Sequence, residues 1–156
     1  MRVLLDSTYL LPLIGVKVRS LDSRILLELK HRHRLLVSDI SLFELAAKGA
    51  KYVVQGVLEP EDVTQGIQSL RMEPEITMVP FIGTQVQNTS YVLRRTLNDY
   101  IDCLILSTAM NEADVLLTED RAIQGFMEDE SIRGLAHAIA PDFRVLNYDQ
   151  LRAVTS

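Results

Sequence analysis

Acidic side chains follow short apolar runs in this chain of 156 residues. The run at residues 3–5 stops at Asp6, and the run at residues 115–117 is followed by Thr118 and, two positions later, Asp120. Short apolar runs of this kind predict buried strands, and ligand sites in open α/β sheets lie beyond the carboxyl ends of parallel strands. Two such strands would therefore bring Asp6 and Asp120 together at one edge of a sheet.

Predicted helix starts add further carboxylates. Apolar residues recur at helical spacing after Asp99, so we expect a helix that Asn98 or Asp99 caps and that carries Asp102 in its first turn. Another helix is expected from residue 42, where Ser41 and Glu44 have the spacing of a capping box. The acids at strand ends or helix starts are Asp6, Asp39, Glu44, Asp99, Asp102 and Asp120.

Carboxylates gathered at one place have a definite chemistry. They repel one another unless a divalent cation neutralises them. Oxygen ligands without histidine or cysteine favour Mg²⁺ or Mn²⁺ over zinc. Such a site can bind phosphate oxygens and activate a water for in-line attack. A glycine-rich phosphate loop and a dinucleotide fingerprint are both missing from the sequence, so the pattern favours metal-dependent phosphate-ester hydrolysis.

Each acid also has a structural interpretation. Glu44 is explained by the capping box, Asp102 could be the partner of an Asp99 cap, and Asp120 could cap a helix that begins at residue 121. A cap of this kind contributes about 1 kcal/mol. Independent caps have no reason to gather at one sheet edge, so convergence of the acids would favour a site.

Strands that alternate with helices must hold these acids. We predict strands over residues 2–5, 35–40, 76–81, 115–117 and 143–146, and helices after Asp6 to near Gly15 and over residues 21–33, 42–52, 59–72, 84–97, 99–111, 121–127 and 148–154. Residues 128–141 are expected to be mostly irregular, with a helical turn at 132–138. The alternation predicts a three-layer α/β/α sandwich around a mostly parallel sheet of about five strands, in a single domain over residues 1–156.

Composition narrows the function classes. With 47% hydrophobic residues and a net charge of −5, the chain is expected to fold and not to bind polyanions over its whole surface. We expect Cys103 in the core, and we expect a soluble, cytoplasmic protein, because neither a secretory leader nor an apolar run of ~18 residues occurs. The cations cluster at two places, which are either solvated helix faces or a surface for a phosphate backbone: Lys30, Arg32 and Arg34, and the pair Arg94 and Arg95.

Four motifs occur in a recognisable order. They are LLDST at the N-terminus, SDISLFE, DCLILSTA and LLTED. In this order and separation the chain resembles the PIN-domain ribonucleases over nearly its whole length, and it is similar in size to the VapC toxins of toxin–antitoxin pairs.

The resemblance implies a function and a site. Asp6, Glu44, Asp102 and Asp120 would be the catalytic acids that hold one or two Mg²⁺ or Mn²⁺ ions, with Thr118 and Ser7 in support. Asp99 is either the acid used in place of Asp102, a fifth ligand, or only the helix cap. The reaction would be endonucleolytic cleavage of RNA that leaves a 5′-phosphate and a 3′-hydroxyl. Expected partners are RNA, a small antitoxin protein and a second copy of the chain in a homodimer. From the clustering of their charges, and not from the resemblance, we expect Arg94 and Arg95, or the cluster of Lys30, Arg32 and Arg34, to steer the RNA.

Other functions are consistent with the same residues. The chain could be a housekeeping PIN nuclease of RNA processing or decay, or an RNA-binding PIN module without turnover. A metal-dependent phosphatase with Asp6 as nucleophile is disfavoured, because Thr8 stands where that chemistry usually has a second aspartate.

Overall fold

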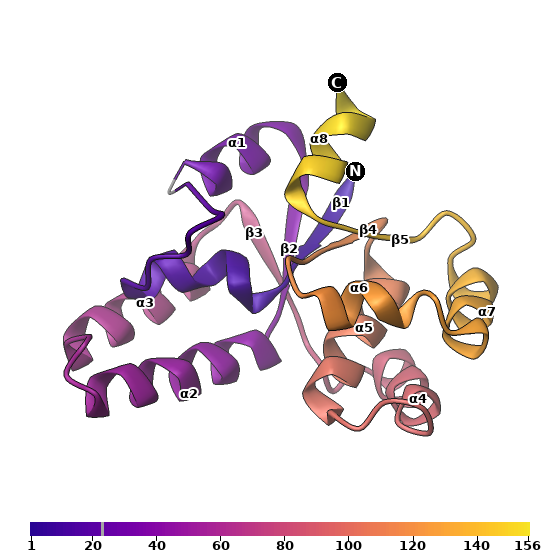
Figure 1. The fold of residues 1–156 in the computed structure, drawn as a ribbon, viewed down its shortest axis with the longest axis horizontal. Coiled ribbons are helices and arrows are strands. Elements are labelled where there is room, and N and C mark those ends of the chain that lie inside the picture. Colours follow the sequence, from indigo (N-terminus) through magenta and orange to yellow (C-terminus); the bar gives the residue numbers. More distant parts are fainter. Residues whose placement is uncertain (23) are drawn as a thin grey trace.

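A five-stranded parallel sheet forms the centre of the molecule (Figure 1). In the computed structural model, which describes residues 1–22 and 24–156, the strands lie in the order β3-β2-β1-β4-β5. Their bounds are β1 Arg2–Leu5, β2 Arg34–Ser38, β3 Ile76–Val79, β4 Val115–Leu117 and β5 Arg144–Leu146. All neighbouring pairs are parallel, so the predicted sheet is confirmed and every strand ends at the same edge.

Helices cover both faces of the sheet (Figure 1). They are the 3₁₀ helix η1 Ser7–Ile14 and the α-helices α1 Ile25–Arg32, α2 Ile40–Val54, α3 Pro60–Met72, α4 Thr84–Leu93, α5 Tyr100–Glu112, α6 Arg121–Phe126, α7 Glu130–Ile139 and α8 Tyr148–Thr155. Alternate residues of β1 belong to different cores. Val3 and Leu5 pack with η1 and the helices α1 to α3, whereas Leu4 packs with α4 and α5. This alternation produces the predicted three layers.

An ion pair lies at the sheet edge where the strands begin. The Arg2 guanidinium donates to the Asp114 carboxylate at 2.8 Å, and Asp114 also accepts from the Arg2 backbone at 2.7 Å. Asp114 thus lies opposite the predicted site, because it directly precedes β4. No helix of residues 1–22 and 24–156 is long and apolar enough to cross a bilayer.

The capping box predicted at Ser41 and Glu44 is wrong. Helix α2 begins earlier, at Ile40, after Asp39 in the N-cap position. The Asp39 carboxylate does not cap the helix, because it accepts a hydrogen bond from the Phe81 backbone at 2.8 Å. Within the described residues, the buried Ser41 hydroxyl has no partner. Glu44 therefore lies in the second turn, where capping does not explain it.

The expectation of irregular structure over residues 128–141 is also wrong. Helix α7 runs through this segment, and the Asp129 carboxylate caps it by accepting from the backbones of Ser131 and Ile132. Ile132 and Ala136 are buried on one face, so tertiary packing stabilises a segment that looked polar and small. The helix predicted over residues 21–33 begins only at Ile25, and position 23 lies outside the described residues.

Helix η1 approaches α3 closely at Gly66. A Cβ atom at Gly66 would lie 2.1 Å from the Leu13 carbonyl oxygen. Only glycine allows this approach, because backbone atoms cannot move aside as the end of a flexible side chain can. The contact fixes η1, which directly follows Asp6.

We expect Gly66→Ala to destabilise the fold by about 2–3 kcal/mol, because the added methyl forces η1 and α3 apart. Urea unfolding measures the loss. Gly134→Ala in α7 is the matched control, since nothing lies within 4 Å of a Cβ at that position. It should be neutral or stabilising by about 0.5–1 kcal/mol. Equal stability of the two variants would contradict the packing argument.

Candidate functional site

The predicted acids lie where the strands end. Asp6 follows β1, Asp120 lies three positions after the end of β4, Glu44 is in α2 and Asp102 is in the first turn of α5. The charges of Asp6 and Asp102 act on the Glu44 carboxylate, and those of Asp6, Asp120 and Asp99 act on Asp102. These acids therefore lie close enough to one another, at the carboxyl edge of the sheet, for their charges to interact, and we call the surface between Asp6, Glu44, Asp102 and Asp120 the opening.

Hydrogen bonds hold the Asp6 carboxylate in place. Only 5% of this residue is exposed. Its Oδ1 accepts from the Ser7 backbone at 2.7 Å, and its Oδ2 accepts from the hydroxyls of Thr118 at 2.9 Å and Thr8 at 3.2 Å. Such bonds stabilise a buried carboxylate that would otherwise lose its hydration.

Thr118 connects two of the acids. Its buried hydroxyl donates to Asp6, and the same oxygen accepts from the Asp120 backbone at 3.0 Å. The Asp6 backbone in turn donates to the Leu117 carbonyl at 3.0 Å, which continues the pairing of β1 and β4 past the last strand residue. Thr118 therefore lies between Asp6 and the backbone of Asp120 and is hydrogen-bonded to both.

Two of the acids also cap helices. Asp99 caps α5 by accepting from the Ile101 backbone at 2.8 Å and the Asp102 backbone at 3.3 Å. Asp120 caps α6, where its Oδ1 accepts from the Ala122 backbone at 2.7 Å. The capping interpretation is thus right for Asp99 and Asp120, but for Asp120 it does not exclude a site, because capping occupies only one carboxylate oxygen.

Burial and crowding raise the pKa of the other two acids. Burial raises the pKa of Glu44 to about 7, the charges of Asp6 and Asp102 add to the effect, and Lys48 opposes it. Burial also raises the pKa of Asp102 to about 6, with further contributions from Asp99, Asp120 and Asp6. Lys48 therefore compensates the negative charge at the opening only in part.

The donor set fits a hard divalent cation. The side chains at the opening offer carboxylate and hydroxyl oxygens, which are the ligands that Mg²⁺ and Mn²⁺ prefer. In the part of the chain that the structure describes, no three acidic, histidine or cysteine side chains are already close enough to enclose an ion. The acids are gathered at the opening but not closed around an ion.

Sequence reasoning did not assign Lys48 and Glu119 to the site. The Lys48 ammonium donates to the Ser7 hydroxyl at 2.9 Å and lies 3.9 Å from Glu44 Oε2. Glu119, between Thr118 and Asp120, accepts from the Tyr9 hydroxyl and, at 3.0 Å, from the Tyr148 backbone. The spacing of Lys48 four residues after Glu44 was a visible signal, whereas no local pattern marked Glu119.

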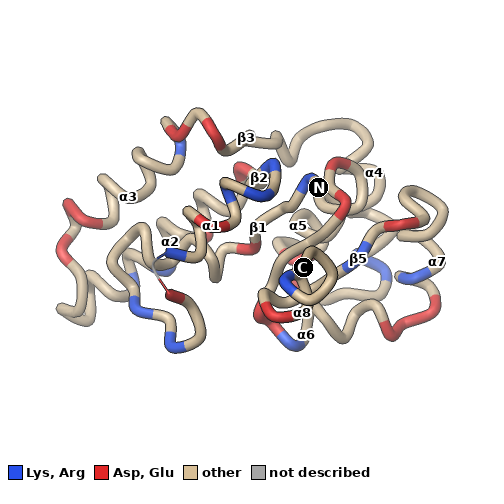
Figure 2. Tube along the Cα trace, turned by 90° about the horizontal axis from the view of Figure 1, so that it is seen from above, with Lys and Arg blue, Asp and Glu red and all other residues tan. Residues whose placement is uncertain are grey.

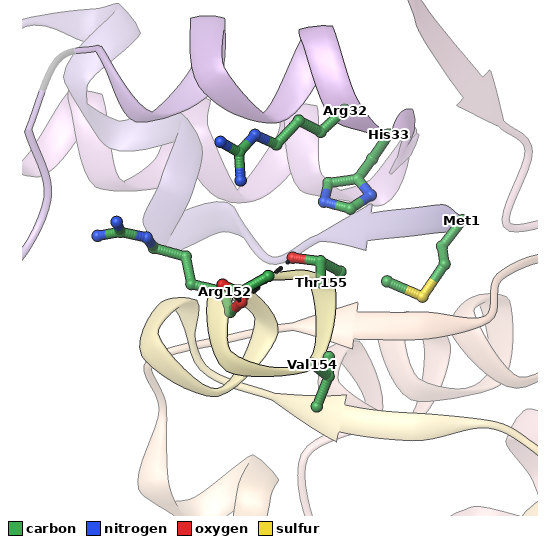
Figure 3. A pocket seen from close by; sticks show the side chains of 7 residues that line it. Met1, Arg32, His33, Arg152, Val154 and Thr155 are labelled. Carbon is green, nitrogen blue, oxygen red and sulfur yellow. Dashed lines mark hydrogen bonds between the residues drawn. The ribbon is translucent and has the colours of Figure 1, made fainter.

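The basic cluster from Lys30 to Arg34 lies away from the acids. Figure 2 shows lysine and arginine positions beside the start of β2 and the N-terminus. Lys30 forms ion pairs with Glu73 and Glu75, and Arg34 begins β2 at the edge opposite Asp6. Arg32 lines a separate cavity of about 830 Å³ between α1 and α8 (Figure 3).

The other predicted RNA-steering pair ends α4. The Arg94 guanidinium donates to the Leu97 carbonyl at 2.8 Å, so this side chain closes the turn that leads into α5. Arg95 is exposed beside it. The structure thus gives Arg94 a local structural partner and leaves Arg95 accessible to solvent.

The sequence matches the PIN domain family over residues 3–126. The chain belongs to the PIN domain family. Its members are nucleases, and the matched range includes all four acids of the opening. The fold is similar to a chain in the crystal structure of VapBC2 from Rickettsia felis bound to a DNA fragment from their promoter. That likeness has a TM-score of 0.62 and 20% identity, and it covers 96% of this chain and 100% of the other. No curated protein sequence matches the chain significantly.

The raised pKa of Glu44 in this PIN domain should make stability depend on pH. Glu44 binds its proton more tightly in the folded state than in the unfolded state. Protonated Glu44 therefore contributes fully to the free energy of unfolding below about pH 4.5, and this contribution is lost as the pH rises towards 7. In EDTA, Glu44→Gln should therefore be more stable than the wild type at pH 8 by about 1–2 kcal/mol, and nearly equal at pH 4. Urea unfolding at both pH values measures the difference.

Glu75→Gln is the control for this comparison. Its ion pair with Lys30 lowers the pKa of Glu75, which is the opposite direction from Glu44. We expect no gain in stability from Glu75→Gln at pH 8. A similar gain in both variants would mean that general removal of negative charge, and not the site, causes the effect.

Proposed function

We propose that this chain is a single PIN domain that cleaves RNA internally in a reaction that depends on Mg²⁺ or Mn²⁺. The observation that carries the proposal is the convergence of Asp6, Glu44, Asp102 and Asp120 from separate elements on one opening. The pKa values of Glu44 and Asp102 are raised there, as is typical of carboxylates in a site that binds a cation. RNA as the substrate rests on the resemblance to PIN-domain ribonucleases.

The acids have different parts in the proposed reaction. Asp6, Asp102 and Asp120 hold the cation, and Glu44 completes the site or orients the attacking water. Thr118 keeps Asp6 and Asp120 at a fixed separation through its two hydrogen bonds. A bound divalent ion supplies Lewis-acid stabilisation of the charge that develops on the phosphodiester. The products are a 5′-phosphate and a 3′-hydroxyl.

Asp99 is a lesser candidate for a ligand. One of its oxygens already accepts from two backbone amides at the start of α5. Its charge nevertheless raises the pKa of Asp102, so it adds to the negative potential of the opening. We propose that Asp99 mainly fixes the helix that presents Asp102.

We further propose that the chain is the toxin of a toxin–antitoxin pair and forms a homodimer. VapBC2, whose fold it shares, is a complex whose crystal structure contains promoter DNA. Helix α2 and the turn after it expose apolar side chains that a protein partner could cover: Phe43 is 61%, Val57 is 65% and Val54 is 88% exposed.

Asp6→Asn and Asp102→Asn should each abolish Mn²⁺-dependent cleavage of single-stranded RNA while the far-ultraviolet circular dichroism spectrum stays unchanged. Each removes a carboxylate oxygen from the opening without changing side-chain size. Asp142→Asn, at an exposed position after α7, is the matched control and should cleave at the wild-type rate. Full activity in Asp102→Asn would contradict the assignment.

Mn²⁺ should also stabilise the folded protein directly. A cation that binds only the folded state at 100 times its Kd adds about 2.7 kcal/mol to the free energy of unfolding. Thermal unfolding with increasing Mn²⁺ should show this gain in the wild type and in Asp142→Asn, and a much smaller one in Asp6→Asn. An unchanged Tm of the wild type would contradict a metal site.

The toxin assignment predicts a cellular effect. Induced expression of the wild type in a bacterial host should arrest growth, because uncontrolled cleavage of RNA stops translation. Asp6→Asn at the same protein level, checked by immunoblot, should allow normal growth. Active nuclease in vitro without growth arrest would favour the housekeeping alternative.

A further inference from the structure

Lys48 is a cation within an otherwise acidic opening. It lies in α2 one turn after Glu44, and its side chain is 40% exposed. Its charge acts on the pKa of Glu44 and, across the opening, on that of Asp102 in α5. The ammonium is therefore close enough to acids of both α2 and α5 for its charge to act on them.

The hydrogen-bond partner of Lys48 is a neutral hydroxyl, and its ion pair with a carboxylate is long. The ammonium donates to Ser7 Oγ at 2.9 Å, whereas the nearest Glu44 oxygen is 3.9 Å away. The Ser7 hydroxyl in turn hydrogen-bonds the Glu44 side chain, and Ser7 itself is buried. An ammonium has three donors, and the bond to Ser7 uses one of them. Lys48 is thus held firmly while donors remain for another oxygen.

The charge of the opening requires such a donor. The carboxylates of Asp6, Glu44, Asp102 and Asp120 carry four negative charges when ionised, so one divalent ion leaves the opening negative and two leave it neutral. A phosphodiester carries a negative charge of its own, so the net charge of neither arrangement attracts it, although a bound cation can contact one of its oxygens. Lys48 supplies a positive charge beside the carboxylates without being one of the proposed cation ligands.

We propose that Lys48 binds the substrate in the nuclease reaction. Its ammonium, anchored by Ser7, donates a hydrogen bond to a non-bridging oxygen of the scissile phosphodiester. This assignment rests on the proposed function and adds to it a phosphate-binding residue that works beside the cation. The alternative is that Lys48 only balances the negative charge of the carboxylates in the folded protein and does not bind the substrate.

The test compares Lys48→Gln with Lys51→Gln, the exposed lysine one turn further along α2. In Mn²⁺, Lys48→Gln should lower kcat/KM for a single-stranded RNA by about 10- to 100-fold. The slope of log kcat/KM against log salt concentration should become shallower by about 0.7, because one phosphate contact is lost. Lys51→Gln should change neither quantity. Lys48→Arg should recover most of the salt dependence, because it keeps the charge.

Thermal unfolding separates the two roles of Lys48. If Lys48 binds phosphate, Lys48→Gln keeps the full Mn²⁺-dependent gain in Tm. If Lys48 only compensates the acids, Lys48→Gln lowers the Tm in EDTA and leaves kcat/KM and its salt slope at the Lys51→Gln values, which overturns the proposal. Absence of Mn²⁺-dependent cleavage in the wild type would overturn the proposed function itself.

Discussion

Repulsion among carboxylates at the carboxyl edge of the sheet is the constraint on which the site depends. Asp6, Glu44, Asp102 and Asp120 come from separate elements and face the same opening, and burial raises the pKa of Glu44 and Asp102. A fold that places such acids together must hold each of them by other means. The structure does so with hydroxyls, backbone amides and helix starts, each of which favours negative charge.

The bonds around Thr118 are the centre of this arrangement. A single hydroxyl donates to Asp6 and accepts from the Asp120 backbone, so the ends of β1 and β4 are fixed relative to each other. Glu119 adds a second connection, because it accepts from Tyr9 in η1 and from the Tyr148 backbone at the start of α8. The segment that carries Asp120 is therefore attached to both η1 and α8.

Residues beyond the matched PIN range take part in this support. The family match ends at residue 126, yet β5 pairs with β4, and α8 supplies the Tyr148 backbone that binds Glu119. The Tyr148 hydroxyl also donates to Glu28 in α1 at 2.6 Å. The C-terminal segment thus contacts three parts of the fold: strand β4, helix α1 and the loop that carries Asp120.

The sequence by itself determined the strands, their common direction and the convergence of Asp6 with Asp120. Short apolar runs separated by helices predict a parallel sheet, and all strands of a parallel sheet end at the same edge. The cap at Asp99 was also readable, because it depends on neighbours in the chain.

Only the tertiary structure decided the environment of Glu44, the helix over Glu130–Ile139 and the place of Lys48. Ser41 and Glu44 have the spacing of a capping box, and nothing local reveals that the helix begins earlier. Lys48 meets Ser7 across 41 positions of sequence, and Ile132 and Ala136 are buried against distant residues. A local pattern records interactions between near neighbours, whereas these three features arise from packing between segments far apart in the chain.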